Sequence, residues 1–148
     1  MITVNNVVLQ IKKDTILKDI NIHFDSGKIH GIIGRNGSGK TMLMKCICGL
    51  IPPTSGEVIV AGKKIGVECD FPENIGVIIE TPEFIPYYSG FKNLKLLADV
   101  QHKINDIDIC KSMEQVGLSS KLKRSVKKYS LGMRQRLGLA QAIMENPD

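Results

Sequence analysis

The chain has 148 residues, of which 43% are hydrophobic and 24% charged, so it is long enough for one folded domain with a buried core. This composition excludes a disordered chain and a fibrous protein, and the sequence shows neither a secretory leader nor an apolar run long enough to cross a bilayer. The formal net charge is +5, and we expect any role at a membrane to depend on a partner.

The first third of the chain predicts strands. Residues 2–11 are typical of an extended segment. Ile20, Ile22 and Phe24 then alternate with polar side chains, which is the period of a strand with one buried face. Turn-forming residues at 25–28 lead into residues 29–33, an almost continuously apolar run that predicts a strand buried on both faces.

A glycine-rich loop follows this strand and fits the pattern G-x-x-x-x-G-K-[ST]. Glycines allow backbone N–H groups to approach a phosphate closely. Lys40 adds positive charge for the β- and γ-phosphate oxygens, Thr41 offers a hydroxyl to Mg²⁺, and a helix beginning near Gly39 directs its positive end at the same anion. The sequence therefore predicts a nucleotide phosphate site formed by Gly34, Arg35, Asn36, Gly37, Ser38, Gly39, Lys40 and Thr41.

The helix after Lys40 is apolar nearly all round, so we expect it to lie buried in the centre of the fold until Gly49 and two prolines end it. Residues 55–65 predict a hairpin at the edge of the first sheet, with its turn near Ala61 and Gly62. Residues 75–79 are a second apolar run and predict another buried strand, which ends on the carboxylate of Glu80.

Helical patterns replace strand patterns from about residue 83. Apolar side chains recur at helical spacing over residues 91–100, and a second helix is predicted from Asn105 to Gly117. A third follows Ser130, a good N-cap residue, with Leu137, Ala140 and Met144 on its buried face. We therefore expect a core over residues 1–82 and a helical subdomain over residues 83–148. The serine hydroxyl and the N–H of Gly132 at this helix start could bind a second anion.

Five basic residues fall within eight positions, namely Lys121, Lys123, Arg124, Lys127 and Lys128. We interpret this run as a solvated connector rather than a nucleic-acid surface, because no aromatic residue is interleaved for base stacking. The cysteines Cys46, Cys48, Cys69 and Cys110 lack zinc-like spacing and predict reduced thiols in a cytosolic protein.

Three stretches, taken in order, resemble the ATP-binding-cassette family, the nucleotide-driven subunits of ABC transporters. Residues 34–41 resemble its Walker A loop, residues 78–82 its Q-loop region, and residues 129–136 its signature motif. The variants Ile-Glu-Thr-Pro and Ser-Leu-Gly-Met-Arg-Gln-Arg are most similar to the bacitracin and lantibiotic exporter branch. The resemblance covers the whole chain and implies an α/β P-loop NTPase fold with an N-terminal antiparallel β portion, a core sheet around the phosphate-loop helix and a helical subdomain.

The resemblance also implies ATP and Mg²⁺ as cofactors and a head-to-tail pair of ATP-binding subunits. Ser130, Gly132 and Arg134 of one subunit would then cover ATP held by the other. An integral membrane subunit would meet the helical subdomain and residues 80–88, and export would be driven from the inner, cytoplasmic face of the membrane. No nucleic-acid partner is expected.

Two departures from the family pattern affect the site. Ile11 stands where an adenine-stacking aromatic is usual, so we expect weak or unselective base recognition. Glu80 replaces the usual glutamine, and its carboxylate would bind Mg²⁺ while repelling the γ-phosphate in the absence of metal. At the signature motif, we expect Met133 to contribute packing.

The sequence ends at Asp148, before the family's Walker B carboxylates and switch histidine, so it offers no catalytic residue. We expect a fragment that by itself binds nucleotide poorly and hardly hydrolyses it, and that belongs to an active ATPase in its complete form. Two alternatives stay open: a soluble cassette ATPase acting on ribosomes or nucleic acid, and a non-hydrolytic nucleotide-binding fragment.

Overall fold

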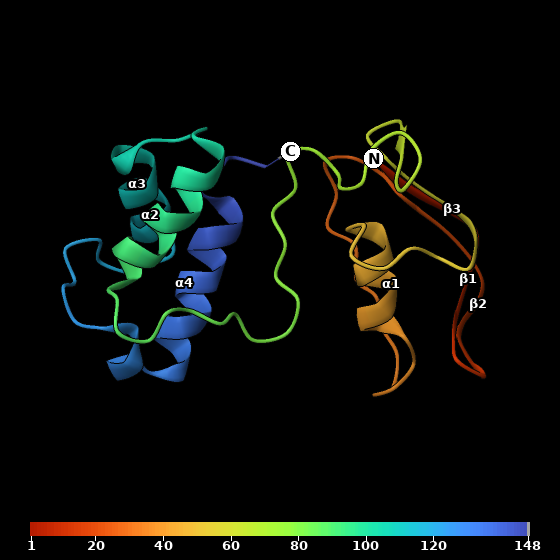
Figure 1. Cartoon of the computed structure of the whole chain (residues 1–148), viewed down its shortest axis with the longest axis horizontal. Helices are drawn as coiled ribbons and strands as arrows, with labels where there is room; N and C mark the ends of the chain where they lie inside the picture. Colours follow the sequence, from red (N-terminus) through yellow and green to blue (C-terminus); the bar gives the residue numbers. More distant parts are fainter. Residues whose placement is uncertain (148) are drawn as a thin grey trace. The chain divides into compact units, whose positions relative to one another are not determined.

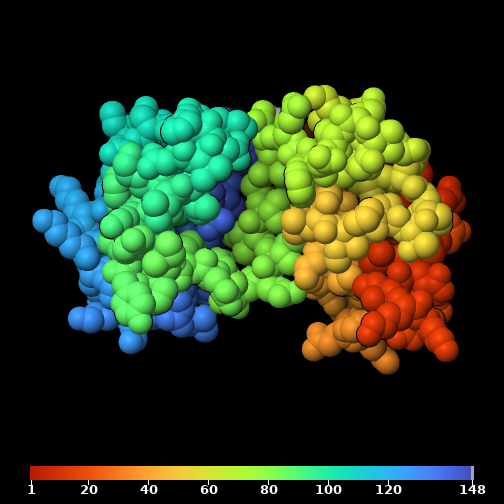
Figure 2. Space-filling model, viewed as in Figure 1, coloured from red at the N-terminus to blue at the C-terminus, as the bar shows by residue number. Residues whose placement is uncertain are grey.

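A computed structural model describes residues 1–147, and Asp148 lies outside the described residues. The chain divides into two compact units, Met1–Glu73 and a second that begins at Asn74 (Figures 1 and 2). Each unit has its own hydrophobic core. Residues 74–82, which the sequence groups with the core part, lie with the second unit.

The first unit contains an antiparallel sheet with the strand order β2-β1-β3-β4 (Figure 1). Its strands are β1 (Ile2–Ile11), β2 (Asp14–Phe24), β3 (Ser55–Val60) and β4 (Lys63–Lys64). The two N-terminal strands and the hairpin are therefore confirmed. The hairpin turns at Ala61 and Gly62, whose φ angles of 49° and 83° suit the tight turns that join antiparallel strands.

Helix α1 (Lys40–Ile47) packs on one face of this sheet. Leu43, Cys46 and Ile47 are buried against strand residues that include Val4, Val7, Leu9, Leu17 and Val58. Met44 on the other side of the helix is 42% exposed. The expectation that α1 is buried all round is therefore wrong for the described residues, because the sheet covers only one side of it.

The four cysteines are free thiols, as predicted. Burial raises the pKa of the Cys46 and Cys48 thiols, which makes them unreactive structural residues.

The two apolar runs predicted as buried strands do not form strands. Residues 29–33 have no regular secondary structure. Ile29 and Ile33 are almost fully accessible to solvent, whereas Ile32 packs partly against the core of the first unit. Residues 75–79 also lack strand pairing, and Ile75 and Ile78 are exposed. A strand buried on both faces needs neighbouring strands for its backbone hydrogen bonds. Within residues 1–147 no strand pairs with either run, so both predictions are wrong for this part of the chain.

The second unit is helical. It contains α2 (Gly90–Gln101), α3 (Asp106–Gln115), a short 3₁₀ turn η1 (Val126–Lys128) and α4 (Leu131–Ile143). Side chains cap all three α-helices at their N-termini: Ser89 for α2, Asn105 for α3 and Ser130 for α4. The predicted helices are therefore confirmed. No helix among the described residues combines the length and apolar character required to cross a bilayer.

Leu94, Ile109, Met113 and Leu137 form the centre of the second core and are at most 1% exposed. Ala140 and Met144 are also buried, which confirms the predicted apolar face of α4.

Two glycine contacts fix residues 74–82 along α4. A Cβ atom at Gly138 would collide with the ring of Pro82, and one at Gly76 would collide with the carbonyl of Ala142. A small cavity of about 110 Å³ lies in the same region, between residues 77–82 and the α4 residues Gly138 and Gln141. Close backbone packing therefore positions the segment that carries Glu80.

Candidate nucleotide site

The start of α1 differs from the starts of the other α-helices. Gly39 occupies its N-cap position with φ 90°, and no side chain caps the helix. The first backbone N–H groups of a helix have no partner within the helix, and in the other α-helices of residues 1–147 a serine or asparagine side chain accepts from them. At α1 these donors, with the positive end of the helix dipole, are left for an anion.

The glycines of residues 34–41 meet different requirements. Gly37 and Gly39 have φ angles of 80° and 90°, which side-chain-bearing residues rarely adopt. A Cβ at Gly39 would also lie 2.9 Å from Leu17 Cδ2 and 3.2 Å from the carbonyl oxygen of Ile16. Glycine is therefore required here both by the backbone conformation and by the close approach of the loop to β2.

Lys40 lies folded back over the loop. Its Nζ donates to the carbonyl oxygens of Gly34 and Arg35, at 2.7 Å and 2.8 Å. These contacts hold the ammonium beside the loop backbone, where a bound phosphate would meet it. Thr41, Arg35, Asn36 and Ser38 are exposed, so their polar groups are accessible to a ligand.

The strand register relates Ile11 to this loop. Gly39 approaches Ile16 and Leu17 of β2, and β2 pairs with β1 so that Leu17 faces Leu9 and Asp14 faces Ile11. Ile11 is 40% exposed at the end of β1. It therefore lies near the end of the hairpin that the phosphate loop approaches, and its apolar side chain is available to a ligand.

The residues predicted for Mg²⁺ lie in different units. Thr41 lies in the first turn of α1, in the first unit, whereas Glu80 belongs to the second unit. Glu80 is exposed and has φ 64°, an uncommon conformation for a residue with a side chain. Within residues 1–147 no group of three or more His, Cys, Asp or Glu side chains could hold a metal ion.

The signature segment forms the N-terminus of α4. Ser130 Oγ accepts a hydrogen bond from the N–H of Met133, and Arg134 Nη1 donates to the carbonyl of Tyr129. Apart from its chain neighbours and the backbone of its own helix, a Cβ added at Gly132 would meet no atom within 4 Å. Packing among residues 1–147 therefore does not explain glycine at that position.

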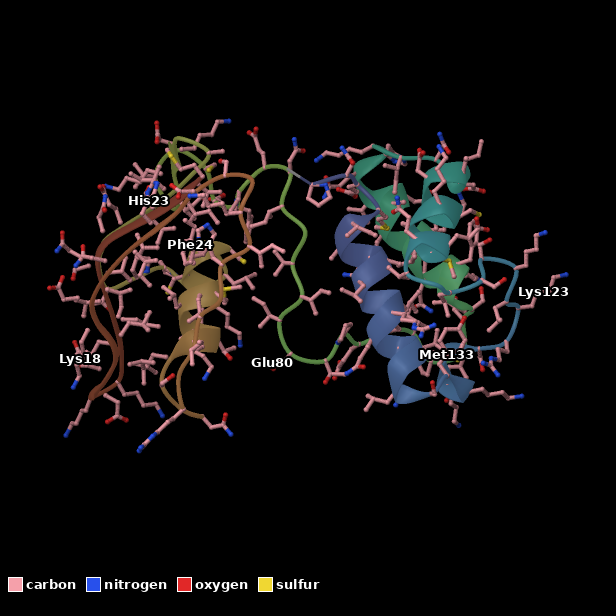
Figure 3. The ribbon with its side chains drawn as sticks, turned by 180° about the vertical axis from the view of Figure 1, so that it is seen from behind. Lys18, His23, Phe24, Glu80, Lys123 and Met133 are labelled. Carbon is pink, nitrogen blue, oxygen red and sulfur yellow. The ribbon has the colours of Figure 1, made fainter. Side chains whose placement is uncertain are left out.

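Met133 packs against the core of the second unit, as predicted. Arg124, which we did not single out as a site residue, extends its guanidinium to within 2.8 Å of Met133 Sδ. The contact places a cation beside the signature helix (Figure 3 labels Met133). The sequence gives no sign of this contact, because Arg124 lies in the connector between α3 and α4, outside the signature segment.

The chain is similar to known proteins in sequence and in fold. A family model described as "ABC transporter" matches residues 17–148. The chain is 45% identical over 148 residues to the ABC transporter ATP-binding protein YybJ of Bacillus subtilis, covering 100% of this chain and 68% of that protein. It is 39% identical over 155 residues to the bacitracin transport ATP-binding protein BcrA of Enterococcus faecalis, covering 100% of this chain and 48% of BcrA.

A solved structure shows the same fold. The ATP-binding cassette MJ0796, in a dimeric state bound to ADP and Pi, superposes with a TM-score of 0.85 at 23% identity. The match covers 99% of this chain and 71% of that one. These comparisons confirm the resemblance and the fold class that the sequence predicts, and they show that the chain spans about half to two thirds of the length of its relatives.

Proposed function

Because the chain belongs to the ABC transporter family, we propose that it is the ATP-binding part of an exporter and couples ATP binding and hydrolysis to movement of a separate membrane subunit. The observation that carries this proposal is the uncapped start of α1, with left-handed glycines before it and Lys40 folded over the loop. These features form a binding site for terminal phosphates. In the helices of the second unit, a serine or asparagine side chain accepts from the first backbone N–H groups, so α1 alone of the four α-helices in residues 1–147 leaves all of them to a ligand.

We propose that residues 34–41 bind the phosphates of ATP through their backbone N–H groups. Lys40 would exchange its contacts with the carbonyls of Gly34 and Arg35 for the β- and γ-phosphate oxygens. The Lys40 ammonium, which already lies beside the loop, would thereby neutralise part of the phosphate charge. Ile11 would pack on the adenine face through apolar contact alone, so the site would discriminate weakly between bases.

The Thr41 hydroxyl and the Glu80 carboxylate would hold Mg²⁺ together with phosphate oxygens and water. When bound, Mg²⁺ supplies positive charge that neutralises the phosphates. A carboxylate at position 80 would repel the γ-phosphate without the metal, so we propose that ATP binding depends steeply on Mg²⁺.

We propose that two ATP-binding subunits close head to tail, so that Ser130, Gly132 and Arg134 of one face ATP on the other. The open space at Gly132 supports this arrangement, since glycine there serves no packing within the chain. The dimeric state of the similarly folded MJ0796 is a further support. Closure would then move the membrane subunit, which we place against the helical unit and residues 80–88.

The resemblance to BcrA supports a peptide antibiotic or another amphiphilic compound as the exported substrate. It also supports a location at the inner, cytoplasmic face of the cell membrane. We assign no water-activating carboxylate among residues 1–148. We therefore propose that hydrolysis needs a catalytic group outside those residues and that this chain alone hydrolyses ATP very slowly.

Nucleotide affinity tests the phosphate site directly. Lys40→Ala removes the ammonium over the loop, and we expect at least ~10-fold weaker Mg-ATP binding by titration calorimetry, corresponding to one charge-assisted hydrogen bond. Lys103→Ala is the matched control, because Lys103 is an exposed lysine in the helical unit, away from the loop in sequence. Equal affinities for the two variants would refute the assignment.

A further inference from the structure

The basic run between α3 and α4 is exposed. Lys121, Lys123, Arg124, Lys127 and Lys128 all lie at the surface. Elsewhere, lysines such as Lys28, Lys63 and Lys95 form ion pairs with Asp25, Glu73 and Asp106. Among residues 1–147 no ion pair joins any of the five to a carboxylate. Their charge is therefore available to an external anion.

An exposed aromatic ring lies beside this run, which the sequence did not predict. Residues 85–89 pair with residues 125–128: the N–H of Val126 donates to the carbonyl of Tyr88 at 2.8 Å, and the N–H of Lys127 to that of Pro86 at 2.9 Å. The pairing brings Lys127 Nζ to 5.8 Å from the centre of the Tyr87 ring, and Tyr87 is 76% exposed. We call Tyr87 and the five cations the basic surface.

The basic surface lies on an ordered support. Val126 and Tyr129 are buried at 3% and 4% exposure, and Leu122 packs against the core of the second unit. A bridge between Ser89 and Ser125 adds to the backbone pairing. Figure 3 shows Lys123 on this connector, at the margin of the helical unit. The charges are thus presented from fixed backbone positions, although each side chain can adjust.

The nearby aromatic rings distinguish between two kinds of anionic partner. Single-stranded nucleic acid binds to successive exposed rings on which its bases stack. Here Tyr129 is buried, and the Lys92 ammonium lies 3.8 Å from the centre of the Tyr88 ring and covers one face of it. Only Tyr87 of the three tyrosines is largely exposed. An anionic bilayer requires no stacking and no pocket, only several cations, and a tyrosine suits its headgroup region.

We propose that the basic surface binds the headgroups of anionic lipids and thereby holds the helical unit against the membrane. The inference deepens the proposed function, which places the protein at the inner face of a membrane. It adds a contact with the lipid itself, made by the five cations next to residues 80–88, which we place against the membrane subunit and which include Tyr87.

The test uses vesicles, without nucleotide or membrane subunit. In a flotation assay, the unmodified protein should bind vesicles of phosphatidylcholine mixed with phosphatidylglycerol, and should not bind phosphatidylcholine alone. The triple variant Lys121→Gln, Lys123→Gln and Lys127→Gln should bind the anionic vesicles roughly 100-fold more weakly. The matched control is Lys12→Gln, Lys13→Gln and Lys18→Gln, which removes the same charge from exposed positions of the first unit (Figure 3 labels Lys18).

The control variant should retain most of its binding to the anionic vesicles. Equal loss in both triple variants would overturn the proposal, because net charge alone would then explain the binding. The proposal would also be overturned if the Lys121, Lys123 and Lys127 variant lost binding to a single-stranded RNA oligomer but bound anionic vesicles as well as the unmodified protein. Thermal unfolding of each variant checks that the fold is intact. A failed vesicle assay leaves the Lys40→Ala result unaffected, so this proposal and the proposed function can fail separately.

Discussion

Gly132 and Gly138 lie on the same helix, α4, in different surroundings. A Cβ at Gly132 meets nothing within 4 Å, whereas one at Gly138 would collide with the ring of Pro82. Both residues have ordinary helical backbone, so backbone conformation does not require glycine at either position. Packing explains Gly138, and the proposed contact across the dimer explains Gly132.

The two glycines therefore predict opposite effects of alanine. Gly132→Ala should leave the free energy of unfolding unchanged or raise it by up to ~1 kcal/mol, because alanine favours helix. It should nevertheless weaken ATP-dependent dimerisation by placing a methyl group where the partner's phosphate would approach. Gly138→Ala should lower the free energy of unfolding by about 1–3 kcal/mol through overpacking.

Urea unfolding and sedimentation velocity with Mg-ATP measure the two effects. The dimerisation measurement is made on the complete protein. Undiminished dimerisation of the Gly132→Ala variant would contradict the proposed role of the signature segment.

At the level of elements, Asn93 connects α2 to the loop before it. Asn93 is 4% exposed, and its Oδ1 accepts from the N–H of Ile85 at 2.7 Å. Its Nδ2 donates to the carbonyls of Ile85 and Ser89. The Asn93 side chain thus supplies the acceptor for the N–H of Ile85 and adds a second donor to two carbonyls that also accept from the backbone N–H groups of Tyr88 and Asn93. It holds part of the segment that we place against the membrane subunit.

Asn93→Ala should lower the free energy of unfolding by about 2–3 kcal/mol, because the partly buried N–H of Ile85 loses its partner and the carbonyls of Ile85 and Ser89 each lose one of two donors. Asn105→Ala is the control. It removes the N-cap of α3 and should cost about 1 kcal/mol. Chemical denaturation of both variants gives the comparison, and an equal or smaller loss for Asn93→Ala would show that the loop does not depend on this residue.

The sequence predicts elements well where the signals are local. Asn105 and Ser130 cap the helices that they were expected to start, and the glycine pattern of residues 34–41 marks the loop before α1. Asn93 and the pairing of Tyr87 with Lys127 were not predictable, because each depends on a contact between segments whose own patterns are ordinary. The burial of α1 was overestimated because apolar composition does not show how many faces a sheet covers.

At the level of the whole molecule, two apolar segments lack sheet partners. Residues 29–33 and 75–79 make no backbone hydrogen bonds within residues 1–147, although their composition is typical of strands inside a parallel sheet. From this composition we predicted strands buried on both faces. The prediction fails because residues 1–147 contain no strand that pairs with either segment.

Hydrogen exchange of this chain tests that description. Amides of residues 29–33 and 75–79 should exchange close to the unprotected rate, whereas amides of β1, which pairs on both sides, should be strongly protected. The amides of β1 are the internal reference. Protection of residues 29–33 equal to that of β1 would show that a sheet partner is present.

The phosphate site is the claim on which the account of function depends. The direct measurement is a crystal structure of the protein with a non-hydrolysable ATP analogue and Mg²⁺. We predict triphosphate density over residues 34–41, within hydrogen-bonding distance of the backbone N–H groups at the start of α1 and of Lys40 Nζ. Triphosphate density at any other position, with Lys40 still bonded to the carbonyls of Gly34 and Arg35, would contradict it.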